Sequence, residues 1–351
     1  MIRVLLVDDS LIALHILQNL LSRVEDIQVI GAVTSAKEAL ELLPSLNPDV
    51  VCTDLHMPLM NGLELTQQIM ATYPLPILVV SVSVQPSSPN VFHLLEAGAI
   101  DVFQKPRDIL SINQDKLAQQ LASKIRIVAG VHVFRRASIV ANTPLPIQIP
   151  TLKPNVSPRI VTIGASTGGP QALRTILSAL PKSFPIPLIC VQHIGADFLP
   201  ELIRWLSEES PLPVLEAKHG ELPHSGVVYF APSDAHLEFD KAGHFSLSQI
   251  PPCDGHRPSA TVLMRSAAYH YGASTIGVLL SGMGHDGASG LVEIASVGGV
   301  TIAQNEESSV VYGMPQAAVA LGVVQHELPL IKIAPTLAVL THNSYSTKSV
   351  K

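Results

Sequence analysis

The sequence has little cysteine, little charge and no long hydrophobic run, and each absence excludes a class of protein. Its three cysteines (Cys52, Cys190 and Cys253) are far apart and form no CxxC pair, which argues against a disulfide framework and against a zinc site. Charged residues make up 14% of the chain and the net charge is −6, so the clustered lysine and arginine of a general nucleic-acid binder are missing. No apolar run approaches the roughly 18 residues of a membrane span.

The remaining composition is that of a globular protein. The first residues pass from a short apolar run to Asp8 and Asp9, which is unlike a signal peptide. We therefore expect a cytoplasmic protein that has no nucleic-acid partner and does not insert into a membrane. At roughly 150 residues per domain, 351 residues suggest two domains, and a hydrophobic content of 47% is ordinary for their cores.

The first 125 residues alternate short apolar runs with amphipathic stretches, which predicts five strand–helix units. Such alternation indicates a parallel sheet covered on both faces, here an α/β (βα)5 doubly wound domain at residues 1–125. The predicted strands cover residues 3–7, 27–32, 49–53, 76–81 and 100–103, and the predicted helices cover residues 11–21, 36–43, 62–70, 91–97 and 112–128.

A proline-rich stretch then interrupts the pattern and predicts a semi-rigid linker at residues 126–157. Alternation resumes beyond it, so residues 158–342 are expected to form a three-layer α/β/α Rossmann-like domain with a mainly parallel sheet, followed by a polar tail at 343–351. Predicted strands there include residues 159–163, 188–192, 226–231, 236–239, 275–280 and 300–304, and predicted helices include residues 170–180, 198–208, 262–271, 289–297 and one starting near 317.

Acidic residues follow two strands of the first predicted domain. In open parallel sheets the chemistry lies outside the carboxyl ends of the strands, where Asp8 and Asp9 follow the first strand and Asp54 follows the third. Three carboxylates there would repel one another unless a cation such as Mg²⁺ joined them. Ser81 ends the fourth strand and Lys105 follows the fifth, which together describe a phosphoryl acceptor with Asp54 as the nucleophile. Singly, each acid also fits a helix cap or a loop position.

As a set, these residues resemble a response-regulator receiver domain. The resemblance is carried by LVDDS at 6–10, TDLHMP at 53–58, NG at 61–62, Ser81, GA at 98–99 and KP at 105–106. It implies that Asp54 is phosphorylated, that Ser81 and Lys105 form the switch, and that Mg²⁺ is held by Asp8, Asp9, Asp54 and the backbone carbonyl of His56. One position departs from many receivers, because Val102 stands where an aromatic residue is common.

The second predicted domain opens with a glycine-rich turn after a strand. Residues 164–170 read GASTGGP and match the G-x-S-x-G pattern, whose small neighbours permit a sharp strand-to-helix turn that exposes Ser166. The start of the helix also directs free N–H groups at the site, which favours an oxyanion. A phosphate-binding loop is the main alternative, although the Gly-Lys-Ser/Thr of a P-loop is missing and Ser166 occupies the middle glycine position of G-x-G-x-x-G.

An activated serine needs a base and an acid that orients the base. His193 follows the strand at 188–192, on the same sheet edge as Ser166, and Asp286 lies in SGMGHDG at 281–287 after another strand. Each also has an ordinary structural explanation, His193 as a capped strand end and Asp286 as a helix N-cap. His219, His224, His236 and His256 lie in turn-rich segments and rank below His193 as the base.

The order serine, histidine, aspartate resembles the catalytic domain of the chemotaxis protein-glutamate methylesterases. The carriers are IGASTGGP at 163–170, QH at 192–193, YFAPSDAHL at 229–237, RPS at 257–259, SGMGHDGA at 281–288, GG at 298–299 and VYGMP at 311–315. The resemblance implies a hydrolase without a cofactor for the ester chemistry, acting on methylated chemoreceptors with release of methanol, and acting also on receptor glutamines. The resemblance also implies that a chemotaxis histidine kinase donates the phosphoryl group to the receiver.

Roles follow from the same resemblance. Ser166 is the expected nucleophile, His193 the general base and acid, and Asp286 the residue that orients His193. The elbow geometry suggests the amide of Thr167 as one oxyanion donor, and the family suggests the amide of Met283. Two positions depart from the family, Asn305 and Thr261, each where an acid is common. Neither belongs to the triad, so we expect an effect on specificity or partner choice at most.

A receiver joined to a hydrolase by a linker suggests gating, in which phosphorylation of Asp54 relieves inhibition. Two other functions stay open at this point: a phospho-regulated signalling adaptor without catalysis, and an esterase acting on another substrate. A DNA-binding response regulator does not fit, because the second half has catalytic turns, little basic clustering and no short recognition-helix domain.

Overall fold

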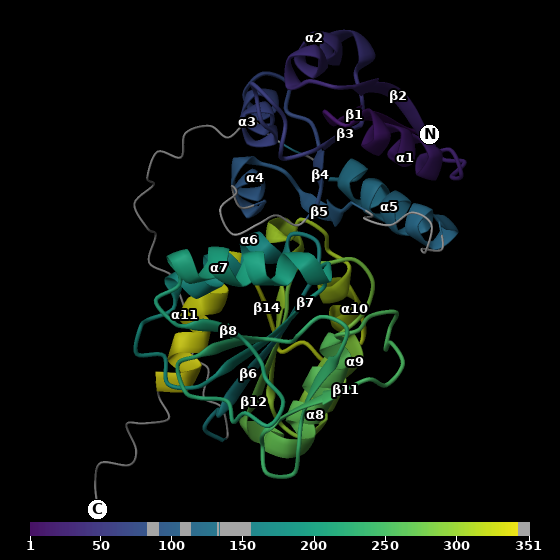
Figure 1. Cartoon of the computed structure of the whole chain (residues 1–351). Coiled ribbons are helices and arrows are strands. Elements are labelled where there is room, and N and C mark those ends of the chain that lie inside the picture. Colours follow the sequence, from purple (N-terminus) through teal and green to yellow (C-terminus); the bar gives the residue numbers. More distant parts are fainter. Residues whose placement is uncertain (83–90, 106–113, 132, 134–155, 343–351) are drawn as a thin grey trace, which may run out of the picture. The chain divides into compact units, whose positions relative to one another are not determined.

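The computed structural model describes residues 1–82, 91–105, 114–131, 133 and 156–342. It divides into two compact units, Met1–Thr143 and Pro144–Lys351, and each is described by itself (Figure 1). Most of the expected linker and the whole polar tail lie outside the described residues. No helix among those residues is both long enough and apolar enough to cross a membrane.

The first unit is a five-stranded parallel sheet with the strand order β2-β1-β3-β4-β5. This order, with helices between successive strands, confirms the expected doubly wound α/β fold. The elements are β1 (Ile2–Val7), α1 (Leu11–Leu21), β2 (Ile27–Val33), α2 (Ala36–Leu46), β3 (Val50–Thr53), α3 (Gly62–Thr72), β4 (Ile77–Ser81), α4 (Phe92–Ala97), β5 (Asp101–Gln104) and α5 (Gln114–Ala129).

Short polar side chains start the first three helices of this unit. Ser10 accepts a hydrogen bond from the Ala13 amide at the start of α1, and Asn61 forms a reciprocal capping box with Glu64 at the start of α3. Helix α2 runs three residues beyond the predicted end, through Pro44, before Asn47 closes it in the left-handed conformation. The proline removes one helical hydrogen bond, and the helix continues only two residues beyond it.

The second unit contains a seven-stranded sheet with the order β14-β13-β12-β6-β7-β9-β8, in which every neighbouring pair is parallel. Its strands are β6 (Ile160–Ala165), β7 (Leu188–Gln192), β8 (Val214–Glu216), β9 (Val228–Phe230), β12 (Thr275–Leu279), β13 (Val300–Gln304) and β14 (His326–Leu328). A separate antiparallel hairpin is formed by β10 (His236–Phe239) and β11 (Phe245–Ser248). The predicted Rossmann-like architecture is confirmed.

Helices cover both faces of this sheet, as Figure 1 shows, with α6, α7 and α11 on one side and α8, α9 and α10 on the other. The helices are α6 (Gly169–Ala179), η1 (Ala196–Phe198), α7 (Leu199–Glu209), α8 (Ala260–Tyr271), η2 (Gly272–Ser274), α9 (Ala288–Ser296), η3 (Glu306–Ser308), α10 (Met314–Ala320) and α11 (Leu330–His342). The sequence did not predict β14 or α11, and α10 begins at Met314 and not near residue 317.

The order of the strands determines where chemistry can occur. Strand β6 lies at the centre of the sheet, and the chain leaves it toward β7 on one side while β12 pairs with its other edge. Such a reversal of strand order is a topological switch point, and the loops at the carboxyl ends of the strands separate there to leave a crevice. Strand β1 occupies the corresponding position in the first unit, between β2 and β3.

Candidate active site

Ser166, His193 and Asp286 follow three neighbouring strands of the second unit. Ser166 comes directly after β6 and His193 directly after β7, and these two strands are in register with Ala165 opposite Gln192. The His193 amide donates a 3.0 Å hydrogen bond to the Ala165 carbonyl, which holds the two strand ends together. Asp286 lies in the loop between β12, on the other side of β6, and α9. All three predicted residues therefore lie at one edge of the sheet.

The turn that carries Ser166 depends on two glycines, one with a positive φ and one that passes close to the serine. Gly168 has φ of +77° as the N-cap of α6, a conformation that L side chains rarely adopt. Gly282, in the loop after β12, passes so near Ser166 that a Cβ atom on it would lie 2.7 Å from the serine Cβ. The Ser166 amide donates 3.0 Å to the Ser281 carbonyl and ties the turn to this loop. Ser166 is consequently positioned by the backbone of its own turn on one side and by the loop after β12 on the other.

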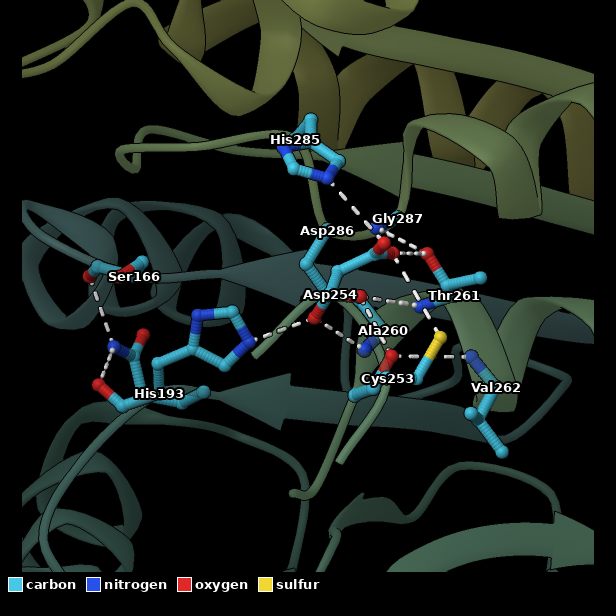
Figure 2. A network of polar contacts seen from close by, with 12 residues as sticks. Ser166, His193, Cys253, Asp254, Ala260, Thr261, Val262, His285, Asp286 and Gly287 are labelled. Atoms are coloured by element: carbon cyan, nitrogen blue, oxygen red, sulfur yellow. Dashed lines mark hydrogen bonds and ion pairs between the residues drawn. The ribbon is translucent and has the colours of Figure 1, made fainter. Parts of the chain in front are cut away.

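His193 makes one strong contact to the acid. Its Nε2 lies 2.8 Å from Oδ2 of Asp286, and both side chains are largely buried. Among the described residues, Nδ1 of His193 is buried without a hydrogen-bond partner, and in Figure 2 this edge of the ring faces Ser166. If Nε2 carries the proton toward the carboxylate, Nδ1 is the basic nitrogen. The ring is therefore oriented for proton transfer at Nδ1.

A second histidine lies against the ring of His193. The imidazole of His256 stacks on that of His193 with centroids 3.7 Å apart and planes within 6°. The sequence ranked His256 below His193 because it lies in a turn-rich segment, and only the fold shows that this segment packs over the triad. Of the other histidines, His236 is buried and contacts the Pro251 carbonyl, and His219 accepts from the Leu247 amide.

Asp286 is buried, and four groups surround its carboxylate. Besides His193, it accepts hydrogen bonds from the Ser259 hydroxyl at 2.6 Å, the Ala260 amide at 2.7 Å and the Thr261 amide at 3.0 Å. These donors belong to the first turn of α8, whose free amides and dipole favour a negative charge. Asp286 therefore binds the start of α8, whereas the N-cap of its own helix α9 is Gly287, which makes no side-chain cap.

These contacts determine the protonation of Asp286. Burial on its own would raise the pKa of the carboxyl group, but the hydrogen bond and charge of His193, with the donors at Ser259 and Thr261, hold the pKa well below the ordinary 3.8. The group is ionised throughout the neutral range, as an acid that orients a histidine must be.

Gln192 belongs to a motif that carries the family resemblance, but the sequence assigned it no role in the site. Its buried side-chain amide donates 2.9 Å to the Ser166 carbonyl and 3.2 Å to the His193 carbonyl, so one group bridges Ser166 and His193. Gly169 leaves room for it, since a Cβ there would lie 2.2 Å from Oε1 of Gln192. No motif could have identified this role, because the partners of Gln192 are backbone atoms.

The two expected oxyanion donors lie next to Ser166. The Thr167 carbonyl accepts 2.7 Å from the Ser281 hydroxyl, which fixes the orientation of that buried residue. Met283 follows Gly282 in the loop that contacts Ser166, and its side chain is half exposed. Its amide donates to no protein atom within the described parts of the chain. The Ser166 amide, in contrast, is already used by Ser281.

The first unit brings together the acidic residues that the sequence predicted. Ligand oxygens of Asp8, Asp9 and Asp54 all lie within 4.8 Å of one another, with Asp8 and Asp54 buried and Asp9 exposed. Nζ of Lys105 lies 2.5 Å from Oδ2 of Asp8 and 2.8 Å from Oδ2 of Asp54. Burial raises the pKa of Asp8 despite the opposing effect of Lys105. A hard divalent cation fits this donor set, because it would offset the crowding of three carboxylates.

The remaining predicted residues of this pocket also lie at the strand ends. Ser81 is buried at the end of β4, and its carbonyl accepts from the Lys105 amide at 2.9 Å. His56 lies in the loop after Asp54. Val102 is buried in β5, so a small aliphatic side chain fills the position where many receivers have an aromatic one.

Comparisons with known proteins point to one combination of domains. A family model described as CheB methylesterase matches residues 161–337, and one described as response regulator receiver domain matches residues 4–117. The chain is 42% identical over 346 residues to a Methanospirillum hungatei protein named protein-glutamate methylesterase/protein-glutamine glutaminase 2, with 97% of this chain and 99% of that protein covered. A Nitrosospira multiformis protein of that activity name is 40% identical, with 99% of both chains covered.

A solved structure agrees with these matches. The crystal structure of the Thermotoga maritima CheB methylesterase catalytic domain is 40% identical to this chain, with a TM-score of 0.51, and covers 53% of this chain and 100% of that chain.

The close approach of Gly282 to Ser166 generates a first prediction. In Gly282→Ala the new Cβ would overlap the Ser166 side chain and Met314, so the serine and the Met283 amide must move apart. We expect kcat for ester hydrolysis to fall at least about tenfold, since a misplacement near 1 Å typically costs on the order of 100-fold. Gly130→Ala is the control, because its Cβ meets nothing closer than 3.5 Å. Equal kcat values in the two variants would contradict this account of the turn.

The depressed pKa of Asp286 generates a second prediction. A carboxyl group with a lowered folded-state pKa stabilises the fold fully above its unfolded pKa of 3.8 and loses that effect as the pH falls through the folded value. The free energy of unfolding of wild type is therefore expected to exceed that of Asp286→Asn by a constant amount from pH 7 to about 5. The difference is expected to decrease below about pH 4. Urea unfolding followed by fluorescence of the single tryptophan, Trp205, measures it.

The control for that measurement is Asp240→Asn. Asp240 also has a lowered pKa, through hydrogen bonds from the His244 and Ala242 amides and from the His244 ring, but it is exposed. Solvent screening should make the corresponding difference for Asp240→Asn smaller at every pH. A difference in the free energy of unfolding between wild type and Asp286→Asn that increases toward acid pH would contradict the lowered pKa of Asp286.

Proposed function

Since this chain belongs to the CheB methylesterase family and carries a receiver domain, we propose that it hydrolyses glutamate γ-methyl esters on the cytoplasmic domains of chemoreceptors and releases methanol. We place the receiver at residues 1–125, the linker at 126–157 and the catalytic domain at 158–342, and we place the protein in the cytoplasm. One observation carries the proposal: Nε2 of His193 lies 2.8 Å from Oδ2 of Asp286, and His193 follows the strand that pairs with the one before Ser166.

In the first half of the reaction, Ser166 Oγ attacks the ester carbonyl while Nδ1 of His193 takes the serine proton. The carbonyl electrons move to oxygen, and the amides of Thr167 and Met283 stabilise the oxyanion. Each such donor typically contributes about 2.7–4 kcal/mol. Asp286 holds the tautomer with Nε2–H and stabilises the imidazolium. When the carbonyl re-forms, methoxide leaves and receives the proton from His193 as methanol.

In the second half, water attacks the glutamyl ester of Ser166 and gives its proton to Nδ1 of His193. Collapse of the intermediate breaks the bond to Oγ, and His193 returns the proton to Ser166. The products are a free glutamate side chain and the original enzyme. A glutamine substrate enters the same sequence with ammonia as the leaving group, which agrees with the second activity in the names of the relatives.

The receiver is proposed to control this chemistry. Asp54 is the phosphorylation site, and Asp8, Asp9, Asp54 and the carbonyl of His56 would hold Mg²⁺. The bound ion would neutralise negative charge of the phosphoryl group. Lys105, which already contacts Asp8 and Asp54, supplies a second positive charge, and the Ser81 hydroxyl contacts the phosphoryl oxygens. A chemotaxis histidine kinase is the proposed phosphodonor.

The catalytic proposal is tested by methanol release from methylated receptor membranes. We expect Ser166→Ala to reduce release by at least about 1000-fold, because loss of the nucleophile removes the covalent route. If Ser166→Ala releases methanol as fast as wild type does, the assignment of Ser166 as the nucleophile is rejected. Hydrolysis of simple esters without release from receptor would favour an esterase with another substrate, and no hydrolysis of either would favour a non-catalytic adaptor.

The control by phosphorylation is tested in the same assay with Mg²⁺ and a small phosphodonor. Wild type is expected to release methanol faster with the donor, whereas Asp54→Asn is expected to give a ratio of about one with and without it, since the amide cannot accept the phosphoryl group. Shifting the enzyme from 1:99 to 99:1 in favour of its active state needs about 5.5 kcal/mol. Phosphorylation must therefore favour the active state by about this free energy to stimulate release roughly 100-fold. Equal stimulation of variant and wild type would reject control through Asp54.

A further inference from the structure

Thr261 lies beside the triad, although the sequence assigned it no role there. It is fully buried in the first turn of α8. Its hydroxyl donates 2.9 Å to Oδ2 of Asp254 and accepts 2.7 Å from the Gly287 amide, and it lies 3.3 Å from the Ser289 hydroxyl. Its own amide donates to Asp286. One residue thus contacts both the carboxylate of the acid and the backbone on its C-terminal side.

Asp254 completes these contacts from the turn that precedes α8. Its backbone has φ of +51°, and its second oxygen, Oδ1, lies 3.3 Å from Nε2 of His285. His285 and Gly287 are the two chain neighbours of Asp286. Figure 2 shows the result: Asp254 and Thr261 hold the residues on either side of the acid. The same turn carries His256, whose ring stacks on His193.

We propose that Thr261, with Asp254, is a positioning residue that fixes the loop of Asp286 and so sets the orientation of His193. The proposal rests on the function proposed above, because it assigns a purpose to contacts around that triad. Neither residue touches the substrate. Both act through Asp286.

The hydroxyl group is suited to this place by its chemistry. It donates one hydrogen bond and accepts others at the same time, which the pair formed by Asp254 and the Gly287 amide requires. A valine would occupy the same volume but leave the Gly287 amide without its acceptor, and it would leave Oδ2 of the half-buried Asp254 with only the weak donor Sγ of Cys253. An ionised aspartate could accept from Gly287 but could not donate to Asp254, and the two carboxylates would repel each other.

A purely structural role would have a different consequence. Loss of a buried hydroxyl that only stabilises the fold lowers the unfolding midpoint without changing the turnover of the folded enzyme. Thr275 provides the matched case: it is fully buried, and its hydroxyl donates 3.2 Å to the Ala267 carbonyl of the same helix α8, away from Asp286. Thr275→Val therefore removes a comparable hydrogen bond from α8.

The test uses the full-length chain with Thr261→Val, Thr261→Ser and Thr275→Val. Thr261→Val is expected to lower kcat for methyl ester hydrolysis at least about tenfold, with KM changed by less than about twofold, and to shift the acid limb of the kcat profile to lower pH. The shift is expected because His193 loses part of the support of Asp286 for its charged form. Thr261→Ser keeps the hydroxyl and is expected to have the kcat and the acid limb of wild type. Thr275→Val is expected to show neither the loss of kcat nor the shift of the acid limb.

A second readout is spectroscopic. The proton between His193 and Asp286 is expected as a far-downfield resonance in wild type and Thr261→Ser, and to be shifted or lost in Thr261→Val. If Thr261→Val does not fold, Asp254→Ala removes the partner of the hydroxyl from a less buried site and is expected to change kcat and the acid limb in the same direction.

Two results would overturn the inference. The first is a folded Thr261→Val with the kcat and the acid limb of wild type. The second is a Thr275→Val that loses as much kcat as Thr261→Val. Either result would leave Thr261 with a structural role only. The parallel measurement on Ser166→Ala separates this failure from failure of the proposed function: full activity in Ser166→Ala would reject the triad itself, whereas an inactive Ser166→Ala beside a fully active Thr261→Val rejects the positioning role alone.

Discussion

The buried negative charge of Asp286 is the constraint on which the catalytic unit depends. A carboxylate removed from water is costly unless charged and hydrogen-bonded partners replace the solvent, and here the start of α8 and the ring of His193 do so. Helix α8 must therefore begin at the loop after β12, and the turn at residues 253–256 must precede it there. The need to stabilise one charge brings together segments from three parts of the sequence.

The receiver solves a similar problem with a different partner. Asp8 and Asp54 are buried close together, and the ammonium group of Lys105, which follows the edge strand β5, contacts both carboxylates. A single ammonium cannot neutralise three carboxylates, so the pocket retains an excess of negative charge that attracts a divalent cation. In the second unit, protein donors alone compensate the buried charge, whereas in the receiver the protein donors leave a donor set that a divalent cation fits.

The sequence predicted the positions that depend on strand order and few of those that depend on packing. Residues at the ends of parallel strands meet at one edge, so Ser166, His193 and Asp286 could be grouped before any coordinates were known, and β7, β10 and β13 have the predicted bounds. Helix α11 was missed because Pro329 and Pro335 are typical of irregular chain. Gln192 and Thr261 were missed because their partners are backbone atoms or residues distant in sequence, which no local pattern encodes.

The orientation of the His193 ring has a consequence for how the site is built. In the proposed triad, the nitrogen that serves Ser166 is Nδ1, which is bonded to the ring carbon attached to Cβ, and the more distant Nε2 contacts Asp286. The base therefore lies close to the main chain of β7. In the proposed triad, the pairing of Ala165 with Gln192 therefore helps to set how far His193 lies from Ser166, and the register of two buried strands bears directly on catalysis.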